Sequence, residues 1–376
     1  MASNEESNRY VGKIPLRNIW LLLFYASDLY QYLGNERVAI EDNPDNLAEL
    51  LAKILCHQVE SRLVHNLSYG YQSKSAVLNR VRGRIDILTT ERKHLLQKGQ
   101  IACDFQTLTM DTPRNRYVKA ALVQLIKLNI NDKPKRQCHY LQQRLTELGV
   151  SDVKPYGYSG QSERFGRHDS QDRKMVAAAD LVFSFALPTQ EAGTYGINNP
   201  NNEEGWLRRL FEKAIAGFYQ VNLSKQDWIV AAGRTLNWQT SQMSEGMSAI
   251  LPNMRTDIII EHKSSKQYLV IDTKFNEITK LGYYREESLR NGYLYQIYAY
   301  LRSQEDISKP NTLNSIGMLL HPSIDKMVSE FVEIQGHQIW FCTVNLMESA
   351  QKIKKQLLII LSETLKDYKP LSEHNY

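Results

Sequence analysis

The sequence predicts a mixed α/β fold in two parts, an α+β domain over residues 1–190 and a second domain over residues 191–376. The length supports this division, because 376 residues exceed the usual size of a single domain. Apolar residues recur at helical spacing in both parts, most clearly at 46–67 and 203–221. In the second part, β-branched runs bounded by polar residues indicate strands. Helices and strands are therefore expected together.

The composition is that of an ordinary soluble globular protein, with 42% hydrophobic and 23% charged residues. The net charge of +5 permits contact with nucleic acid without requiring it. Four cysteines stand far apart without a C-x-x-C pair, which disfavours a zinc site or a disulfide framework and favours a reducing cytoplasm. The polar start and the short apolar run at 19–26 predict neither a signal peptide nor a membrane span.

Residues 256–275 carry the most informative pattern of the chain. Two β-branched runs are separated by a polar segment, which predicts a β-hairpin. A symmetric turn at the centre of the polar segment places Asp257 directly opposite Asp272. Cross-strand partners have Cβ atoms about 4.5–5.5 Å apart, so the two carboxylates should be neighbours. Because strand side chains alternate between faces, Lys274 shares a face with Asp272.

Two carboxylates and one ammonium group at this spacing suit a site that cleaves phosphodiester bonds. Asp257 and Asp272 could share one hard divalent cation, which binds phosphate oxygens and activates water. Lys274 would stabilise the negative charge that develops during cleavage. A solvated hairpin with acidic and basic side chains has the same pattern, so the hairpin alone leaves both interpretations open.

Helices predicted on either side of the hairpin carry further candidates. In the helix at 291–301, Gln296 and Tyr300 are four residues apart and share one face. In the helix before the hairpin, Glu212 lies beside the apolar stripe and could turn towards the site. The alternatives are a core helix whose tyrosines only pack, and a surface pair between Arg208 and Glu212.

The N-terminal part is predicted to contain helices at 18–33 and 117–128, the second started by Pro113 with Asp111 or Thr112 as its cap. A β-like run between these helices would place three arginines on one face, as a stripe that binds anions. A solvated basic strand is the alternative. Residues 189–202, rich in Gly, Asn and Pro, are expected to link the two parts. The three arginines are Arg80, Arg82 and Arg84.

The spacing D-x14-D-x-K of Asp257, Asp272 and Lys274 resembles the PD-(D/E)xK nuclease superfamily, although proline is missing before the first aspartate. Gln296 and Tyr300 resemble the Q-x-x-x-Y helix of its RecB-type branch. Nearly the whole chain is similar to the McrC family, the nuclease subunit of McrBC-type modification-dependent restriction systems. The segments that carry this similarity are 14–20, 82–86, 111–116, 251–257, 272–275, 295–300 and 342–346.

The resemblance implies a fold for the second part, a PD-(D/E)xK endonuclease-like domain with a central mixed sheet flanked by helices. It also implies a Mg²⁺-dependent endonuclease with Asp257, Asp272 and Lys274 as its core. Glu212 would add a metal ligand from the helix before the hairpin, and the Q-x-x-x-Y helix would support the site. The substrate would be double-stranded DNA with a modified base of the 5-methylcytosine type.

A separate partner is implied as well, a hexameric McrB-like AAA+ GTPase that drives the reaction. The N-terminal part would dock on this partner and stimulate its hydrolysis. This chain has no G-x-x-x-x-G-K-[ST] motif, so it is not expected to bind a nucleotide itself. An arginine inserted into a neighbouring subunit can act on its phosphates in trans. The candidates for such a contact are Arg80, Arg82, Arg84, Arg114 and Arg116.

Two other functions fit the same residues. A stand-alone restriction or repair nuclease of the same fold would cleave DNA without any partner. A non-catalytic adaptor would only activate the GTPase, and it would have no reason to retain Asp257, Asp272 and Lys274 together.

Overall fold

Two compact units make up the chain. Unit 1 combines Met1–Leu47 with Ser184–Tyr376, and unit 2 is the segment Ala48–Phe183 that separates them in the sequence. This division differs from the expected one at residue 190, because the first 47 residues group with the C-terminal part. The computed structural model describes residues 10–11, 14–27, 30, 47–128, 130–160, 163–166, 169–191, 200–281, 287–309, 312–323 and 327–365.

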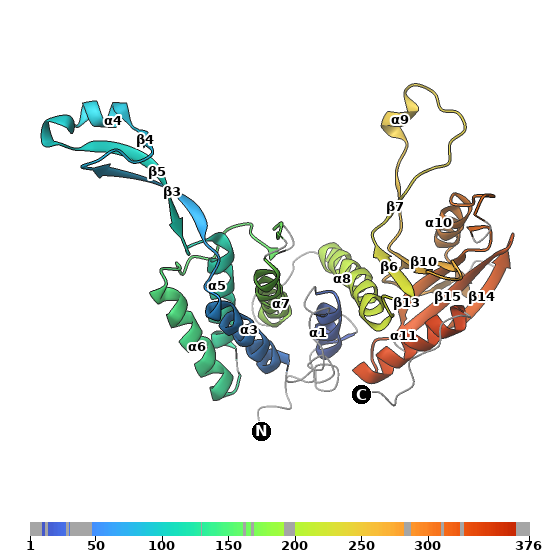
Figure 1. Ribbon diagram of the computed structural model, residues 1–376. Coiled ribbons are helices and arrows are strands. Elements are labelled where there is room, and N and C mark those ends of the chain that lie inside the picture. The colour runs from blue at the N-terminus through green and yellow to red at the C-terminus, as the bar shows by residue number, and fades with distance from the viewer. Residues whose placement is uncertain are drawn as a thin grey trace. The chain divides into compact units, whose positions relative to one another are not determined.

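A six-stranded mixed sheet forms the centre of unit 1 (Figure 1). Its strands are β6 (Trp228–Ala232), β9 (Ile258–His262), β10 (Tyr268–Thr273), β13 (Ile316–Ser323), β14 (Ser329–Ile334) and β15 (His337–Asn345). They follow the order β14-β15-β13-β10-β9-β6. The adjacent strands β10, β13 and β15 are parallel, and the other neighbours are antiparallel. The mixed α/β prediction, with a mixed sheet, is confirmed.

Helix α10 (Asn291–Arg302) covers one face of this sheet. Its Ile297 packs in the same core cluster as Val270 of β10 and Phe341 of β15. Gly317 of β13 permits the close approach, because a Cβ there would lie 2.8 Å from a side-chain carbon of Ile297. A larger residue at this position would push α10 away from the strands, since packed cores have little free space.

Helices α8 (Pro200–Asn222) and α11 (Ala350–Thr364) cover the opposite face (Figure 1). The Tyr219 hydroxyl donates a hydrogen bond to the Leu357 carbonyl over 3.1 Å, which joins the two helices. Because both faces of the central strands are covered, these strands are apolar on both sides, as expected for parallel strands between helix layers.

The N-terminal helix α1 (Leu16–Tyr25) packs against α8. Nine of its ten residues are buried, as its apolar sequence predicts. The backbone carbonyl of Tyr25 lies where a Cβ on Gly217 of α8 would be, and Asn18 donates to the Leu346 carbonyl over 2.6 Å. These contacts explain why the start of the chain belongs to unit 1. The helix ends at Tyr25 rather than near residue 33, and residues 31–33 lie outside the described part.

Short ribbons complete unit 1. They are β1 (Tyr10–Val11) with β2 (Ile14–Pro15), β7 (Thr235–Leu236) with β8 (Met254–Arg255), and β11 (Thr279–Leu281) with β12 (Glu287–Leu289). The connection from β7 to β8 contains the one-turn helix α9 (Met247–Ile250). No helix within the described ranges combines the length and the hydropathy that crossing a membrane requires.

Unit 2 contains long helices and one antiparallel three-stranded sheet. Figure 1 shows the sheet and the short helix α4 extending away from α3, α5 and α6; we call residues 70–109 the N-terminal arm. The helices are α3 (Leu47–Val64), α4 (Ile87–Arg92), α5 (Pro113–Lys127), α6 (Asp132–Glu147) and α7 (Ser170–Glu191). The strands, in the order β3-β5-β4, are β3 (Gly70–Leu78), β4 (Arg84–Ile85) and β5 (Ile101–Thr109).

Two local predictions in this region have clear outcomes. Helix α5 starts at Pro113, and the Thr112 hydroxyl accepts a hydrogen bond from the backbone N–H of Asn115 over 3.1 Å. Thr112, rather than Asp111, is therefore the cap. The expected linker at 189–202 is covered at its ends by α7 and α8, and residues 192–199 lie outside the described part.

Replacing Gly217 by alanine should destabilise unit 1, because the new methyl group must displace the Tyr25 carbonyl. Overpacking of this kind typically costs about 1–3 kcal/mol. Gly205 in the same helix is the matched control, since its Cβ would meet only the flexible end of Arg209 at 3.7 Å. Gly205→Ala should instead stabilise by roughly 0.5–1 kcal/mol. Urea unfolding compares the two variants, and equal midpoints would contradict the close packing of α1 on α8.

Candidate functional site

The antiparallel pairing of β9 with β10 has the predicted register. Ile271 pairs with Ile258, so continuing the ladder by one residue brings Asp257 opposite Asp272. Strand β9 begins directly after Asp257, and β10 ends one residue beyond Asp272. Both carboxylates therefore belong to the same end of the sheet.

Asp257 is held in one orientation by its neighbours on the adjacent strands. Its Oδ2 accepts hydrogen bonds from the backbone N–H of Thr273, at 2.7 Å, and from the Thr273 hydroxyl, at 2.8 Å. Its backbone carbonyl accepts a third from the N–H of Gly233 over 2.8 Å. Thr273 is buried, so these bonds are shielded from water and fix the half-buried carboxylate.

Lys274 forms a buried ion pair with Asp272. Its Nζ lies 2.6 Å from Asp272 Oδ2, and the two side chains are only 5% and 1% exposed. Nζ also donates to the Gln296 side-chain oxygen over 2.9 Å and lies 4.8 Å from the centre of the Tyr293 ring. The shared face of the two charged residues is therefore confirmed. Phe275 points the other way, where its ring contacts α8.

Gln296 and Tyr300 extend this contact into a chain of hydrogen bonds. The Gln296 amide donates from Nε2 to the Tyr300 hydroxyl over 2.7 Å. The Tyr300 hydroxyl then donates to the carbonyl of Arg255 over 2.9 Å. The predicted spacing of four residues on one helix face is confirmed. The chain runs from the Lys274 ammonium to the backbone two residues before Asp257, so α10 links both halves of the site.

Burial and mutual repulsion set the charges of the acidic groups. Burial raises the pKa of Asp272 to about 6; the Lys274 ammonium opposes this shift, and the Asp257 charge adds to it. Burial, followed by the Asp257 charge, also raises the pKa of Glu212, while Arg255 acts in the opposite sense. The helix α8 thus brings Glu212 close enough to share the electrostatic field of the hairpin carboxylates.

The cluster opens to solvent on one side. Asp257 and Glu212 are half-buried, and Arg208 and Arg255 are exposed, whereas the lysine–aspartate pair is buried. A large substrate can therefore approach from the side of Asp257 and Glu212. The Arg208 charge acts on the Glu212 carboxyl, as the surface-pair alternative requires, but no ion pair joins these two described residues, and the Asp257 charge acts on Glu212 more strongly.

The donors suit a hard cation that keeps part of its water shell. Within the described residues, no three His, Cys, Asp or Glu side chains form a ready-made metal cage. Structural zinc needs four protein ligands, whereas Mg²⁺ commonly takes one or two carboxylates with waters and substrate phosphates. Asp272 Oδ2 is buried and has no hydrogen-bond partner besides its ion pair with Lys274. Asp257 and Asp272 therefore fit Mg²⁺.

The three arginines expected to share one strand face do not lie on one strand, so that prediction is wrong. Strand β3 ends at Leu78, and the two-residue strand β4 starts at Arg84. Arg80 and Arg82 lie in the bend between them. The reason is Gly83, whose φ of 68° turns the chain where a Cβ would clash with the backbone of β5. All three arginines remain exposed on the N-terminal arm.

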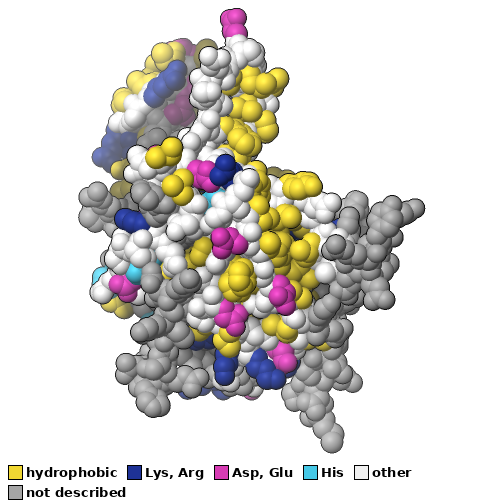
Figure 2. All heavy atoms as spheres, turned by 90° about the vertical axis from the view of Figure 1, so that its right-hand side faces the viewer, with side chains coloured by type: hydrophobic (Ala, Val, Ile, Leu, Met, Phe, Trp, Pro, Cys, Tyr) yellow, Lys and Arg dark blue, Asp and Glu magenta, His cyan; other side chains and the backbone are white. Residues whose placement is uncertain are grey.

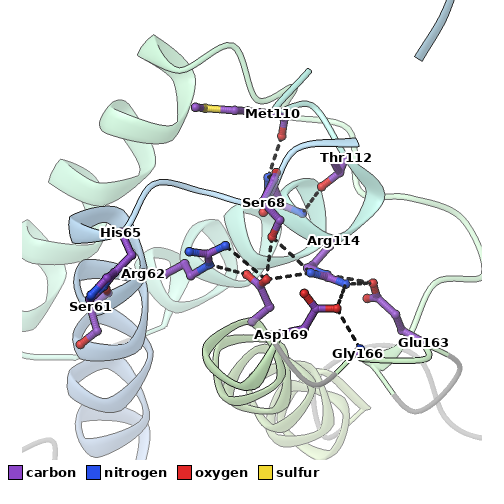
Figure 3. A network of polar contacts seen from close by, with 12 residues as sticks. Ser61, Arg62, His65, Ser68, Met110, Thr112, Arg114, Glu163, Gly166 and Asp169 are labelled. Atoms are coloured by element: carbon purple, nitrogen blue, oxygen red, sulfur yellow. Dashed lines mark hydrogen bonds and ion pairs between the residues drawn. The ribbon is translucent and has the colours of Figure 1, made fainter. Parts of the chain in front are cut away.

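Arg114 and Arg116 have partners inside unit 2. Arg114 donates to Glu163 over 2.8 Å (Figure 3). It also donates to the buried Asp172 over 2.8 Å. Arg116 forms two hydrogen bonds with Asp111, at 2.7 and 2.6 Å. A buried carboxylate such as Asp172 depends on cations of this kind. The structure thus gives these two arginines a role in holding unit 2 together, and it does not favour them as phosphate contacts.

Sequence reasoning missed side chains that support the site from neighbouring elements. The hydroxyl of Thr273 was visible between Asp272 and Lys274, but its bond to Asp257 follows only from the hairpin geometry. His321 of β13 is buried, and its Nδ1 lies 2.9 Å from the Asn276 carbonyl. Burial lowers its pKa to about 4, so it is neutral near neutral pH. No local pattern marks His321, because the parallel pairing of β10 with β13 brings it here.

Fold and site together define a mixed α/β protein in which acidic side chains and a lysine gather at one end of the central sheet. The chain belongs to the family described as McrBC 5-methylcytosine restriction system component, whose sequence model matches residues 13–310. The match includes the hairpin and the helix α10. The family resemblance expected from the sequence is therefore confirmed.

The chain is also similar to individual proteins. The chain is 27% identical over 355 residues to the "Type IV methyl-directed restriction enzyme EcoKMcrBC" of Escherichia coli (strain K12), covering 94% of this chain and 99% of the relative. Two solved assemblies from Thermococcus gammatolerans also match. A refined half-complex of McrB AAA+ hexamers with bound McrC has 14% identity and a TM-score of 0.42, over 92% of this chain and 76% of that chain. The McrBC complex has 16% identity and a TM-score of 0.33, over 57% and 61%.

The hydroxyl of Tyr300 should contribute to the stability of unit 1. Tyr300→Phe leaves the Gln296 amide and the Arg255 carbonyl without this partner, which should cost about 1–3 kcal/mol. Tyr295→Phe on the same helix is the control, because Tyr295 is 66% exposed. The free energy of unfolding of this variant should stay within about 0.5 kcal/mol of the wild type. Urea unfolding measures both values. A Tyr300→Phe variant as stable as the control would refute the role of this hydrogen-bond chain.

Proposed function

We propose that this chain is the DNA-cleaving subunit of a modification-dependent restriction system, a Mg²⁺-dependent endonuclease of the PD-(D/E)xK type. The convergence of Asp257, Asp272 and Lys274 at one end of the sheet, in a McrBC-family chain, is the observation that carries the proposal. A surface hairpin would leave such side chains solvated. Here the lysine and one aspartate are buried and held by a dedicated helix.

Each residue has a distinct task in this proposal. Asp257 and Asp272 would hold Mg²⁺, with Glu212 of α8 as a third donor. When bound, such an ion would supply Lewis-acid chemistry that polarises a phosphate and lowers the pKa of water. Lys274 would donate to a phosphate oxygen as negative charge develops on it. The hydrogen bond to Gln296 keeps the Lys274 ammonium in place. The ammonium therefore holds its orientation, and no solvent has to reorganise around it during the reaction.

The N-terminal arm is proposed as the element that docks on a separate McrB-like AAA+ GTPase and stimulates it. Large apolar side chains on this arm are exposed, among them Ile87 at 68% and Leu88 at 84%. Exposed apolar side chains in such number favour a protein partner. Arg80, Arg82 and Arg84 lie exposed on the same arm, and we propose them for the contact with a nucleotide phosphate in trans.

The two tasks should separate by mutation. We expect the wild type, with its GTPase partner, GTP and Mg²⁺, to cleave methylated duplex DNA. Asp272→Asn or Lys274→Ala should slow cleavage by at least about 100-fold, the effect of losing one electrostatic stabiliser, and leave GTPase stimulation intact. Changing Arg80, Arg82 and Arg84 together to glutamine should abolish the stimulation. Single-turnover cleavage and phosphate release measure the two activities.

A second aspartate–lysine pair provides the control. Asp306 and Lys309 form an ion pair of 3.1 Å at the surface of the same unit. Asp306→Asn and Lys309→Ala should cleave like the wild type. If the site variants also cleave like the wild type, the proposed site is wrong. Cleavage without any GTPase would identify a stand-alone nuclease, and stimulation without cleavage by the wild type would identify an adaptor.

Protons should compete with Mg²⁺ for Asp272, because burial raises the pKa of this carboxyl to about 6. A carboxyl with a raised pKa takes up its proton at a higher pH than usual. At about pH 7.5 it is charged, and Mg²⁺ should raise the Tm through binding to the native state. Below about pH 5.5 the Asp272 carboxyl is mostly neutral, and the increase in Tm on adding Mg²⁺ should become smaller. Thermal unfolding with Mg²⁺ or EDTA measures this, and a rise independent of pH would contradict it.

A further inference from the structure

A second projection leaves unit 1 directly beside the candidate site. It consists of β7, α9, β8 and the segments that join them, and we call residues 234–255 the site arm. Figure 1 shows its outer part, which contains α9, extending away from the sheet. Thr256 and Asp257 follow immediately in the sequence. The arm is thus continuous with the strand that starts at the half-buried carboxylate of the site.

The base of the site arm is fixed to the core. Leu236 and Met254, which pair across the ribbon, are buried in the same cluster as Tyr300. The Gln304 amide donates to the Asn237 carbonyl over 3.1 Å, which ties the arm to the end of α10. Because these contacts hold the inner end of the arm against the core, the arm has a defined direction relative to the site.

The outer part of the arm exposes large apolar side chains. Trp238, Met243, Met247 and Ile250 are 39%, 50%, 39% and 74% exposed. Figure 2 shows hydrophobic side chains gathered along one side of the projection at the top of the view. Trp238 is partly constrained, because its Nε1 donates to the Pro252 carbonyl over 2.8 Å and closes the loop. Met247 and Ile250 belong to α9, and Met243 precedes this helix.

The remaining composition of the arm is poor in acidic groups. Glu245 is the single acidic residue in 234–255, and eight residues between 237 and 253 are uncharged amides or hydroxyls. Arg234 and Arg255, at the two ends of the arm, are exposed. A surface that meets the polyanionic DNA backbone carries few acidic groups, and amides and hydroxyls can form hydrogen bonds with base edges.

We propose that the site arm enters a groove of the duplex beside the cleaved phosphate, with Met243, Met247 and Ile250 in contact with the bases. This inference rests on the proposed nuclease function, since the duplex is the substrate of the adjoining site. Apolar side chains carried into a groove commonly press between base steps and bend the duplex. Arg234 and Arg255, where the arm joins the sheet, would contact DNA phosphates and so orient the arm.

A lipid surface fits the arm less well. Amphipathic elements that bind membranes carry Lys and Arg around their apolar face, whereas both arginines here lie at the base and none lies near the tip. A second copy of the chain remains an outcome of the test, because an apolar tip can also mediate self-association.

The experiment compares two triple variants in an Asp272→Asn background, which keeps the DNA intact. The tip variant combines Met243→Ser, Met247→Ser and Ile250→Ser. The control variant combines Met327→Ser, Ile307→Ser and Ile359→Ser, at positions 49%, 88% and 43% exposed elsewhere in unit 1. Fluorescence anisotropy of a labelled methylated duplex, with the GTPase partner and Mg²⁺, gives Kd at several salt concentrations. 2-Aminopurine in the same duplex reports on base stacking.

The tip variant should bind roughly tenfold more weakly, abolish the 2-aminopurine signal and leave the salt dependence of Kd unchanged, because no phosphate contact is lost. Arg234→Gln should instead reduce the salt dependence. The control variant should bind the duplex with the same Kd as the Asp272→Asn protein. Binding and signal unchanged in the tip variant would overturn the proposal, and so would a loss of self-association in sedimentation velocity with DNA binding intact. Failure of the wild type to cleave would refute the proposed function separately.

Discussion

Burying the ion pair between Lys274 and Asp272 is the constraint on which the candidate site depends. Removing two charges from water costs several kcal/mol for each ion, and their attraction offsets this only when further hydrogen bonds satisfy the remaining polar atoms. Gln296 supplies such a bond to the ammonium, and Tyr300 fixes Gln296 against the backbone before Asp257. The missing Cβ of Gly317 lets α10 approach closely enough to do this. Core packing and site geometry are therefore set by the same helix.

Local rules predicted much of this site. The hairpin register follows from two apolar runs around one polar turn, and alternation along β10 then places Asp272 and Lys274 on one face. Helical spacing predicted the contact between Gln296 and Tyr300. Contacts between distant segments were not predictable. His321 reaches the site through a parallel strand pairing, and α1 joins unit 1 through a glycine of α8. Neither contact produces a pattern in the sequence around the residues that make it.

The arginines illustrate a different limit of sequence patterns. Arg80, Arg82 and Arg84 alternate as they would on a strand, but one glycine with positive φ turns the chain between them. Arg114 and Arg116 look similar in the sequence, yet Arg114 pairs with Glu163 and Asp172, which only the fold brings near, and Arg116 pairs with the neighbouring Asp111. A basic residue indicates a ligand contact only when its charge is not already used inside the protein. The arginines of the two arms are exposed, although Arg82 stacks on the Phe105 ring and the Arg255 charge acts on Glu212.

The grouping of residues 1–47 with the C-terminal part has a consequence for synthesis of the chain. Because α8 comes well over a hundred residues after α1, the apolar α1 leaves the ribosome long before its packing surface exists. Domains usually fold as units while translation proceeds, so unit 2 is complete first and α1 must wait with its leucines and aromatics uncovered. During that interval the apolar side chains of α1 are accessible to chaperones.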